Sequence, residues 1–183
     1  MESNIFDSLE NILNVISGYV WGVPMVGLIL LVGLILTITN KFMQFRGLPH
    51  SFGLISGKYD KKEHKGELTH FQALTAALAA TVGIGNIAGV ATAIYYGGPG
   101  AIFWMWVSAV LGMAIKFTSC TLAVKFRSID EDGNVRGGPM YFIERGLGKR
   151  MKPLAIFFAV CTAIAALGAG NAVQSNTIAD NLV

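Results

Sequence analysis

The sequence predicts an all-α integral membrane protein with about four transmembrane helices, the second of them broken. Of the 183 residues, 53% are hydrophobic and only 14% are charged, whereas a soluble domain carries about 25% charged residues. The apolar residues form long blocks, three of which reach the roughly 20 residues needed to cross a bilayer. A fourth block, rich in Ala and Gly, is interrupted. The basic residues gather in two segments between the blocks, as expected for loops on one side of a membrane.

Residues 1–20 are predicted to form an interfacial amphipathic helix on the membrane surface. Ile5, Leu9, Ile12 and Ile16 recur at helical spacing, which gives a helix one apolar face. The segment contains acidic residues and no Lys or Arg, whereas a secretory signal peptide begins with positive charge. We therefore do not interpret it as a cleaved signal peptide.

The basic residues predict how the chain crosses the membrane. Of the 14 Lys and Arg residues, six lie within 41–65, seven lie within 125–152, and the last is Lys116. Short basic loops stay on the cytoplasmic side, so loops 41–68 and 125–152 are predicted to be cytoplasmic and the N terminus outside. The expected location is the cell membrane (plasma or inner). The four spans of this multi-pass protein are expected at residues 21–40, 69–96, 98–124 and 153–183.

Lys116 is a lone charge inside the third predicted span. A lone lysine inside a span can mark a functional path, but its long stem can also carry the ammonium group to the interface. Because the sequence offers Lys116 no identifiable partner, we favour this second role or a structural contact. The charge-rich stretches 57–67 and 128–138 are predicted to be plain solvated loops.

The second span is interrupted by the residues VGIGN at 82–86. Two glycines separated by one residue weaken a helix by about 1 kcal/mol each relative to Ala. In lipid, a broken helix is tolerated where its freed backbone groups line a cavity or find partners. Freed carbonyls can coordinate a cation, and freed amides at the start of the second half can hold a carboxylate. The alternative is close packing of helices through small residues four apart, a spacing that Gly85 and Gly89 have.

The sequence contains no motif of an enzyme. Gly83, Gly85 and Gly89 read GxGxxxG, one residue longer than the dinucleotide-binding fingerprint, and neither a strand nor the expected acidic residue accompanies them. No nucleophile elbow, metalloprotease motif, P-loop or zinc pattern occurs. We therefore predict that the chain is not an enzyme, and that it contacts a lipid bilayer and no nucleic acid.

A second polar group lies in the fourth predicted span. Asn171 and Gln174 are three residues apart and share a helix face, and Gly168 lies one turn earlier on the same face. Polar residues within a membrane usually face the interior of the helix bundle. These residues either line a substrate pocket or form hydrogen bonds with neighbouring helices.

Residues 97–112, GGPGAIFWMWVSAVLG, resemble the signature of the alanine/glycine:cation symporter (sodium:alanine symporter) family, in the amino acid–polyamine–organocation superfamily. The stretches GNIAGVATAI at 85–94 and GGPMYFIERGLG at 137–148 are also similar to the family. The resemblance implies a leucine-transporter-like fold with two inverted five-helix repeats. Residues 21–40 would be a peripheral transmembrane helix, and residues 69–183 the incomplete first part of the first repeat. The chain is thus expected to be the N-terminal part only, truncated at 183.

The resemblance also implies a function and a set of site residues. The implied function is sodium-coupled symport of alanine and/or glycine by alternating access, with Na+ as the coupling ion. The break VGIGN is similar to the Val-Gly-Leu-Gly-Asn break of sodium-dependent leucine and neurotransmitter symporters. The expected substrate-binding residues are Thr81, Gly83, Ile84, Gly85, Asn86, Gly168, Asn171 and Gln174. The expected Na+ ligands are Ala79, Thr81, Val82 and Asn86.

Within that set, the resemblance gives each group a role. The backbone carbonyls of Ala79 and Val82 would bind sodium, and the amides of Ile84 and Gly85 would hold the substrate carboxylate. The carbonyl of Thr81 and the side chain of Asn86 would face a second cation or the substrate amine.

Two other functions stay open at this stage. A transporter of the same fold could couple another small amino acid to protons. The chain could also be a non-transporting membrane fragment, because the implied fold requires a second broken helix. The preference between alanine and glycine, the sodium stoichiometry and the oligomeric state are not predicted.

Overall fold

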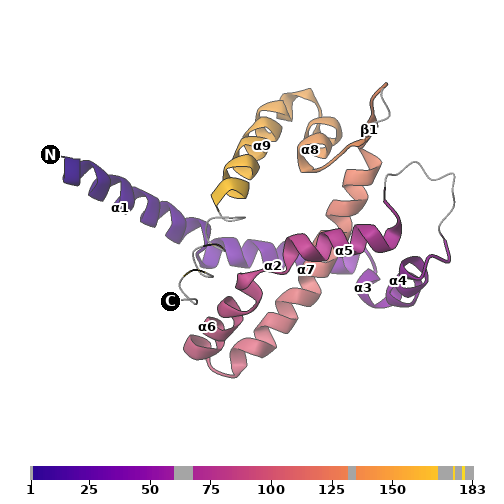
Figure 1. Cartoon of the computed structure of the whole chain (residues 1–183), viewed down its shortest axis with the longest axis horizontal. Helices are drawn as coiled ribbons and strands as arrows, with labels where there is room; N and C mark the ends of the chain where they lie inside the picture. The colour runs from indigo at the N-terminus through magenta and orange to yellow at the C-terminus, as the bar shows by residue number, and fades with distance from the viewer. Residues whose placement is uncertain (1, 60–67, 132–134, 169–174, 176–178, 180–183) are drawn as a thin grey trace.

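A computed structural model describes residues 2–59, 68–131, 135–168, 175 and 179. These residues are almost entirely helical, which confirms the prediction of an all-α chain, with one short hairpin as the exception (Figure 1). The elements are α1 (Glu2–Val20), α2 (Val23–Thr39), α3 (Met43–Arg46), α4 (Leu48–Ile55), α5 (His70–Thr81), η1 (Ile84–Asn86), α6 (Ala88–Gly97), α7 (Gly100–Lys125), β1 (Ser128–Ile129), β2 (Val135–Arg136), α8 (Pro139–Leu147), η2 (Lys149–Met151) and α9 (Lys152–Leu167).

Three stretches among the described residues are long and apolar enough to cross a membrane. They are Asp7–Thr39, Gly100–Lys125 and Lys149–Leu167. The first combines most of α1 with α2, so the predicted surface position of residues 1–20 stays a prediction. The second and third agree with the predicted spans 98–124 and 153–183, although the latter is described as a continuous helix only to Leu167.

The predicted second span is divided in the structure rather than continuous. α5 has 12 residues and α6 has 10, and each is shorter than the roughly 20 residues that a crossing helix needs. α5 begins with a capping box in which Thr69 and Gln72 each accept a hydrogen bond from the backbone amide of the other. The predicted second span therefore consists of two half-helices in the structure.

α2 and α7 pack against each other and run in the same direction. Gly33 faces Leu111. Seven residues further along the chain from each of these, Asn40 Nδ2 donates a hydrogen bond to Thr118 Oγ1 at 3.0 Å. Ala114, between these contacts on α7, is buried. A parallel pair is what the predicted topology requires, because both segments are predicted to run from outside to inside.

After α2 the chain reverses within the predicted cytoplasmic loop. Lys41 and Phe42 adopt positive φ angles of 53° and 54°, which turns α3 back towards α7. Gln44 Nε2 then donates to Thr37 Oγ1 at 3.0 Å and to the Val110 carbonyl at 3.3 Å. The loop therefore contains short helices, α3 and α4, which the sequence did not predict.

The second predicted loop also contains regular structure. β1 and β2 pair antiparallel, with Ser128 opposite Arg136. Arg136 Nε lies 2.6 Å from an Asp130 carboxylate oxygen, so the hairpin carries a cross-strand ion pair. The chain then forms α8, which contacts both α7 and α9.

Candidate functional site

The candidate site is the break between α5 and α6. Val82 ends α5 because its backbone is extended (φ −82°, ψ 111°), although its amide still donates to the Leu78 carbonyl at 2.8 Å. The Thr81 hydroxyl donates to the Ala77 carbonyl at 2.6 Å. The hydroxyl of Thr81 is therefore used inside α5, and its carbonyl is the group that faces the break.

Asn86 joins the two sides of the break. Its side-chain Nδ2 donates to the Thr81 carbonyl at 2.9 Å, and its backbone amide donates to the Gly83 carbonyl at 3.0 Å. Because Nδ2 donates to the Thr81 carbonyl, the amide oxygen Oδ1 points away from that carbonyl. This oxygen has no hydrogen-bond partner among the described residues. The break thus presents one amide oxygen beside the terminal turn of α5, where helix carbonyls lack intrahelical partners.

The glycines of the break are not packed against the rest of the described chain. A Cβ added at Gly85 or Gly89 would meet nothing within 4 Å in this part of the protein. At Gly33 of α2, by contrast, an added Cβ would lie 2.9 Å from the Leu111 Cβ. Close packing therefore explains Gly33, and the described contacts give no such explanation for Gly85 and Gly89.

The groups at the break are uncharged and accessible. Thr81, Val82, Gly85 and Asn86 are exposed, and Gly83 is half-buried. Among the residues that the structure describes, no cluster of His, Cys, Asp or Glu is suited to a metal ion. Carbonyl and amide oxygens are the ligands that hard cations prefer. A neutral oxygen set fits a monovalent cation, and the amides at the start of a helix fit an anionic group.

The predicted site residues lie in two places. Residues 79–86 are adjacent at the break, with Ile84 and Gly85 in η1. Gly168 follows the last residue of α9. Asn171 and Gln174 lie outside the described residues, so their predicted role is not tested.

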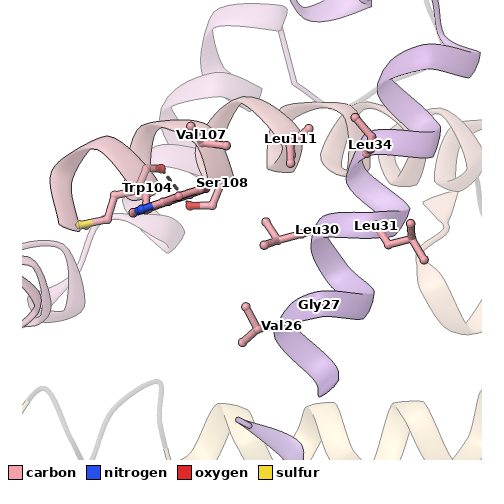
Figure 2. A pocket seen from close by; sticks show the side chains of 10 residues that line it. Val26, Gly27, Leu30, Leu31, Leu34, Trp104, Val107, Ser108 and Leu111 are labelled. Atoms are coloured by element: carbon pink, nitrogen blue, oxygen red, sulfur yellow. Dashed lines mark hydrogen bonds between the residues drawn. The ribbon is translucent and has the colours of Figure 1, made fainter. Parts of the chain in front are cut away.

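The sequence did not predict a pocket between the N-terminal halves of α2 and α7 (Figure 2). Its volume is about 700 Å³. The Ser108 hydroxyl donates to the Met105 carbonyl at 2.9 Å, and the indole of Trp104 adds one N–H donor to a lining that is otherwise apolar. Such an apolar pocket does not match a zwitterion. The lining residues are Val26, Gly27, Leu30, Leu31, Leu34, Trp104, Met105, Val107, Ser108 and Leu111.

A broken membrane helix that exposes backbone carbonyls and amides is typical of secondary transporters. The chain belongs to the sodium:alanine symporter family, which matches residues 6–183. This confirms the family resemblance. Membership in a family of transporters also confirms that the chain is not part of an enzyme.

Three relatives illustrate the range of the family. A sodium/alanine symporter of Methanococcus maripaludis is 49% identical over 172 residues, covering 93% of this chain and 38% of the relative. An amino-acid carrier protein of Bacillus subtilis is 42% identical over 182 residues, covering 100% of this chain and 37% of the relative. A probable sodium/glutamine symporter of Bacillus subtilis is 39% identical over 170 residues, covering 93% of this chain and 35% of the relative. The chain thus spans a little more than a third of the length of these relatives.

Proposed function

We propose that this chain supplies the cation- and substrate-binding half-helices of a sodium-coupled symporter that takes up alanine and/or glycine across the cell membrane by alternating access. The observation that carries the proposal is the pairing of Asn86 with the Thr81 carbonyl across the break. Two of the relatives named above carry the names sodium/alanine symporter and probable sodium/glutamine symporter. Their names support a sodium-coupled amino-acid transporter, and alanine or glycine is the finer part of the proposal.

In the proposed site, sodium binds on the α5 side of the break. The carbonyls of Ala79 and Val82 belong to the end of α5, where the negative end of the helix dipole favours a cation. Thr81 contributes its carbonyl, and Asn86 contributes Oδ1. Uncharged oxygens suit Na+ because it is a hard ion that prefers such ligands.

The substrate carboxylate binds on the α6 side. The amides of Ile84 and Gly85 lie in η1, directly before α6, where the positive end of the helix dipole favours an anion. Gly83 and Gly85 leave room for a small substrate beside the backbone. Gly168, Asn171 and Gln174 are proposed to line the same pocket from the fourth span.

The rest of the architecture is part of the same proposal. The chain adopts the leucine-transporter-like arrangement, with α2 as a peripheral helix and the segments from α5 onwards as part of the first repeat. The N terminus lies outside, and the loops after α2 and α7 lie in the cytoplasm. Na+ is the coupling ion, and the bilayer is the surrounding medium.

Uptake of labelled alanine and glycine into proteoliposomes tests the function. The full-length gene product is reconstituted, and external Na+ is replaced in turn by Li+, K+ and choline, with and without a proton gradient. We expect uptake only with an inward Na+ gradient. Uptake driven by the proton gradient alone would contradict sodium coupling, and the absence of any amino-acid uptake would contradict a transport function.

Asn86→Ala tests the site. It removes one oxygen ligand and the partner of the Thr81 carbonyl. Both groups are exposed in this structure, and a typical hydrogen bond contributes about 0.5–1.5 kcal/mol net. The Na+ concentration for half-maximal uptake should therefore rise about two- to tenfold. Thr81→Val is the matched control, because the Thr81 hydroxyl bonds inside α5, and it should transport like the wild type. Gly85→Leu should fold normally but block uptake, because a Cβ at Gly85 meets nothing within 4 Å among the described residues while the larger side chain would fill the proposed site.

One pattern of results from these variants would contradict the proposed site. If Asn86→Ala kept the wild-type sodium dependence while Thr81→Val lost it, the hydroxyl of Thr81 rather than the break would hold the cation.

A further inference from the structure

The short helices α3 and α4 carry an apolar face that the described part of the chain leaves uncovered. Phe45, Leu48 and Phe52 are three and four residues apart, so they share one side of a helix. Helical backbone hydrogen bonds continue across Gly47 from α3 to α4. The exposed fractions of the three side chains are 60%, 49% and 67%. These three side chains are called the α3–α4 apolar face below.

The polar side of the same two helices is positively charged. Arg46 and His50 are four residues apart and lie on the other side of the helix from the α3–α4 apolar face. No Asp or Glu occurs between Lys41 and Tyr59, and Lys58 adds a further positive charge. Neither Lys41 nor Arg46 forms an ion pair with any other described residue. Separate apolar and basic sides are typical of a helix that lies in the plane of a membrane surface.

The chain that follows α4 packs against its polar side. The ring centroid of Tyr59 lies 4.9 Å from that of His50, and a Cβ added at Gly53 would lie 3.1 Å from Tyr59 Cε2. Leu48 and Phe52 stay exposed although α4 also contacts α5. The described contacts therefore leave the α3–α4 apolar face available to a different partner.

The turn after α2 holds α3 beside two predicted membrane spans. α3 and α4 follow the end of α2 (Figure 1). The Phe42 amide donates to the Thr37 carbonyl at 2.9 Å, and Gln44 Nε2 donates to the Thr37 hydroxyl and to the Val110 carbonyl. Thr37 and Val110 both lie inside predicted spans. α3 thus turns back alongside the membrane helices instead of continuing into the cytoplasm, and lipid is the partner that surrounds it there.

We propose that α3 and α4 form a binding site for anionic phospholipid of the cytoplasmic leaflet. The α3–α4 apolar face inserts among the acyl chains below the headgroups, and Lys41 and Arg46 bind the lipid phosphate. Arg46 offers a planar fork of N–H donors that matches phosphate oxygens, and anionic lipids of this leaflet attract basic residues next to a membrane span. The site anchors the loop that leads to α5. The inference rests on the proposed topology, but not on the coupling ion or the substrate.

Spin labels test the surroundings of the two sides of the helices. The full-length gene product, with its other cysteines replaced, carries a nitroxide at Phe45→Cys or at His50→Cys in nanodiscs of phosphatidylcholine and phosphatidylglycerol. Power saturation compares relaxation by oxygen, which concentrates in lipid, with relaxation by a water-soluble nickel chelate. Both positions are exposed in the structure. We expect the Phe45→Cys label to respond mainly to oxygen and the His50→Cys label mainly to nickel.

Two results of this measurement would overturn the proposal. If both labels respond mainly to nickel, the α3–α4 apolar face lies in water. If the Phe45→Cys label is shielded from both reagents, another part of the full-length protein covers this face instead of lipid.

Lipid titration tests the headgroup contact. The melting temperature of the full-length protein in detergent is followed against phosphatidylglycerol, phosphatidylcholine and inorganic phosphate. Lys41→Gln and Arg46→Gln should each weaken the apparent affinity for phosphatidylglycerol about fivefold, as expected for one basic residue at an anionic surface, and leave that for phosphatidylcholine unchanged. Arg136→Gln is the matched control. It removes a positive charge from the other predicted cytoplasmic loop, but Arg136 already pairs with Asp130, so wild-type affinity is expected.

The headgroup site is refuted if the wild type binds both lipids equally, if inorganic phosphate stabilises it as well as phosphatidylglycerol, or if Arg136→Gln loses as much affinity as Arg46→Gln. An unchanged affinity in Arg46→Gln would refute it too, and this variant decides alone if Lys41→Gln, at its positive φ, fails to fold. None of these measurements requires uptake. Lipid binding without sodium-dependent uptake would therefore contradict the proposed function and leave this site intact.

Discussion

At the residue scale, Gly33 and Gly27 of α2 form a natural matched pair. A Cβ at Gly33 would lie 2.9 Å from the Leu111 Cβ and 3.2 Å from its carbonyl oxygen, whereas a Cβ at Gly27 would meet nothing within 4 Å among the described residues. We therefore expect Gly33→Ala to push α2 away from α7. The cost should be about 1–3 kcal/mol, as for other overpacked sites.

Gly27→Ala should be neutral or slightly stabilising, because alanine favours a helix by up to about 1 kcal/mol over glycine. Thermal unfolding of the purified protein in detergent measures both variants. Equal melting temperatures for the two would show that the Gly33 contact contributes nothing to stability.

The position of the break was predictable from the sequence, but its internal bonding was not. Two glycines one residue apart, between Ala-rich halves, predict an interruption at 82–86, and α5 ends at Thr81. The hydrogen bond from Asn86 Nδ2 to the Thr81 carbonyl depends on the extended backbone of Val82. A side chain that can bond to several nearby backbone groups does not reveal its partner through spacing alone.

At the scale of elements, the hydrogen bond between Asn40 and Thr118 joins α2 to α7 near their cytoplasmic ends as the topology predicts them. Its Nδ2–Oγ1 distance is 3.0 Å. Hydrogen bonds between membrane helices contribute on average about 0.6 kcal/mol and at most about 1.7 kcal/mol. A double-mutant cycle of Asn40→Leu and Thr118→Val should give a coupling energy in this range, measured by unfolding in detergent.

Thr39→Val provides the control for this cycle. Thr39 lies next to Asn40, but its hydroxyl donates to the Ile35 carbonyl within α2. Combined with Thr118→Val, it should show no coupling. A coupling as large as that of Asn40 would mean that the cycle reports a general loosening of the helices rather than this bond.

The sequence predicted the membrane helices better than the connecting loops. The span expected at 98–124 is α7, Gly100–Lys125, because a long apolar block has few alternatives to a helix in lipid. The loops were identified by charge, which gives their side of the membrane but not their structure. The capping of α7 by Arg145 depends on contacts between residues 17 and 19 positions apart, which no local pattern encodes. The hairpin joins nearer residues, Ser128 with Arg136 and Ile129 with Val135, in a stretch where the sequence analysis predicted only a loop.

At the scale of the whole molecule, two independent observations constrain the direction of the helices. The clustered basic residues predict cytoplasmic loops after α2 and after α7. The packing of Gly33 on Leu111 and of Asn40 on Thr118 makes these two helices parallel. Parallel helices separated by the α5–α6 segment require that segment to return the chain across the membrane. We therefore predict that the two half-helices together act as one span.

The predicted topology assigns each loop to one side of the membrane. In a background with Cys120 and Cys161 replaced by serine, Tyr96→Cys at the turn between α6 and α7 should react with a membrane-impermeant maleimide on intact cells. Glu131→Cys at the hairpin should react only after the cells are permeabilised. Both positions are exposed in the structure, so a difference reports the side of the membrane rather than burial. The reverse pattern would invert the topology but keep α2 and α7 parallel, whereas labelling of both sites on intact cells would mean that α7 does not span the membrane.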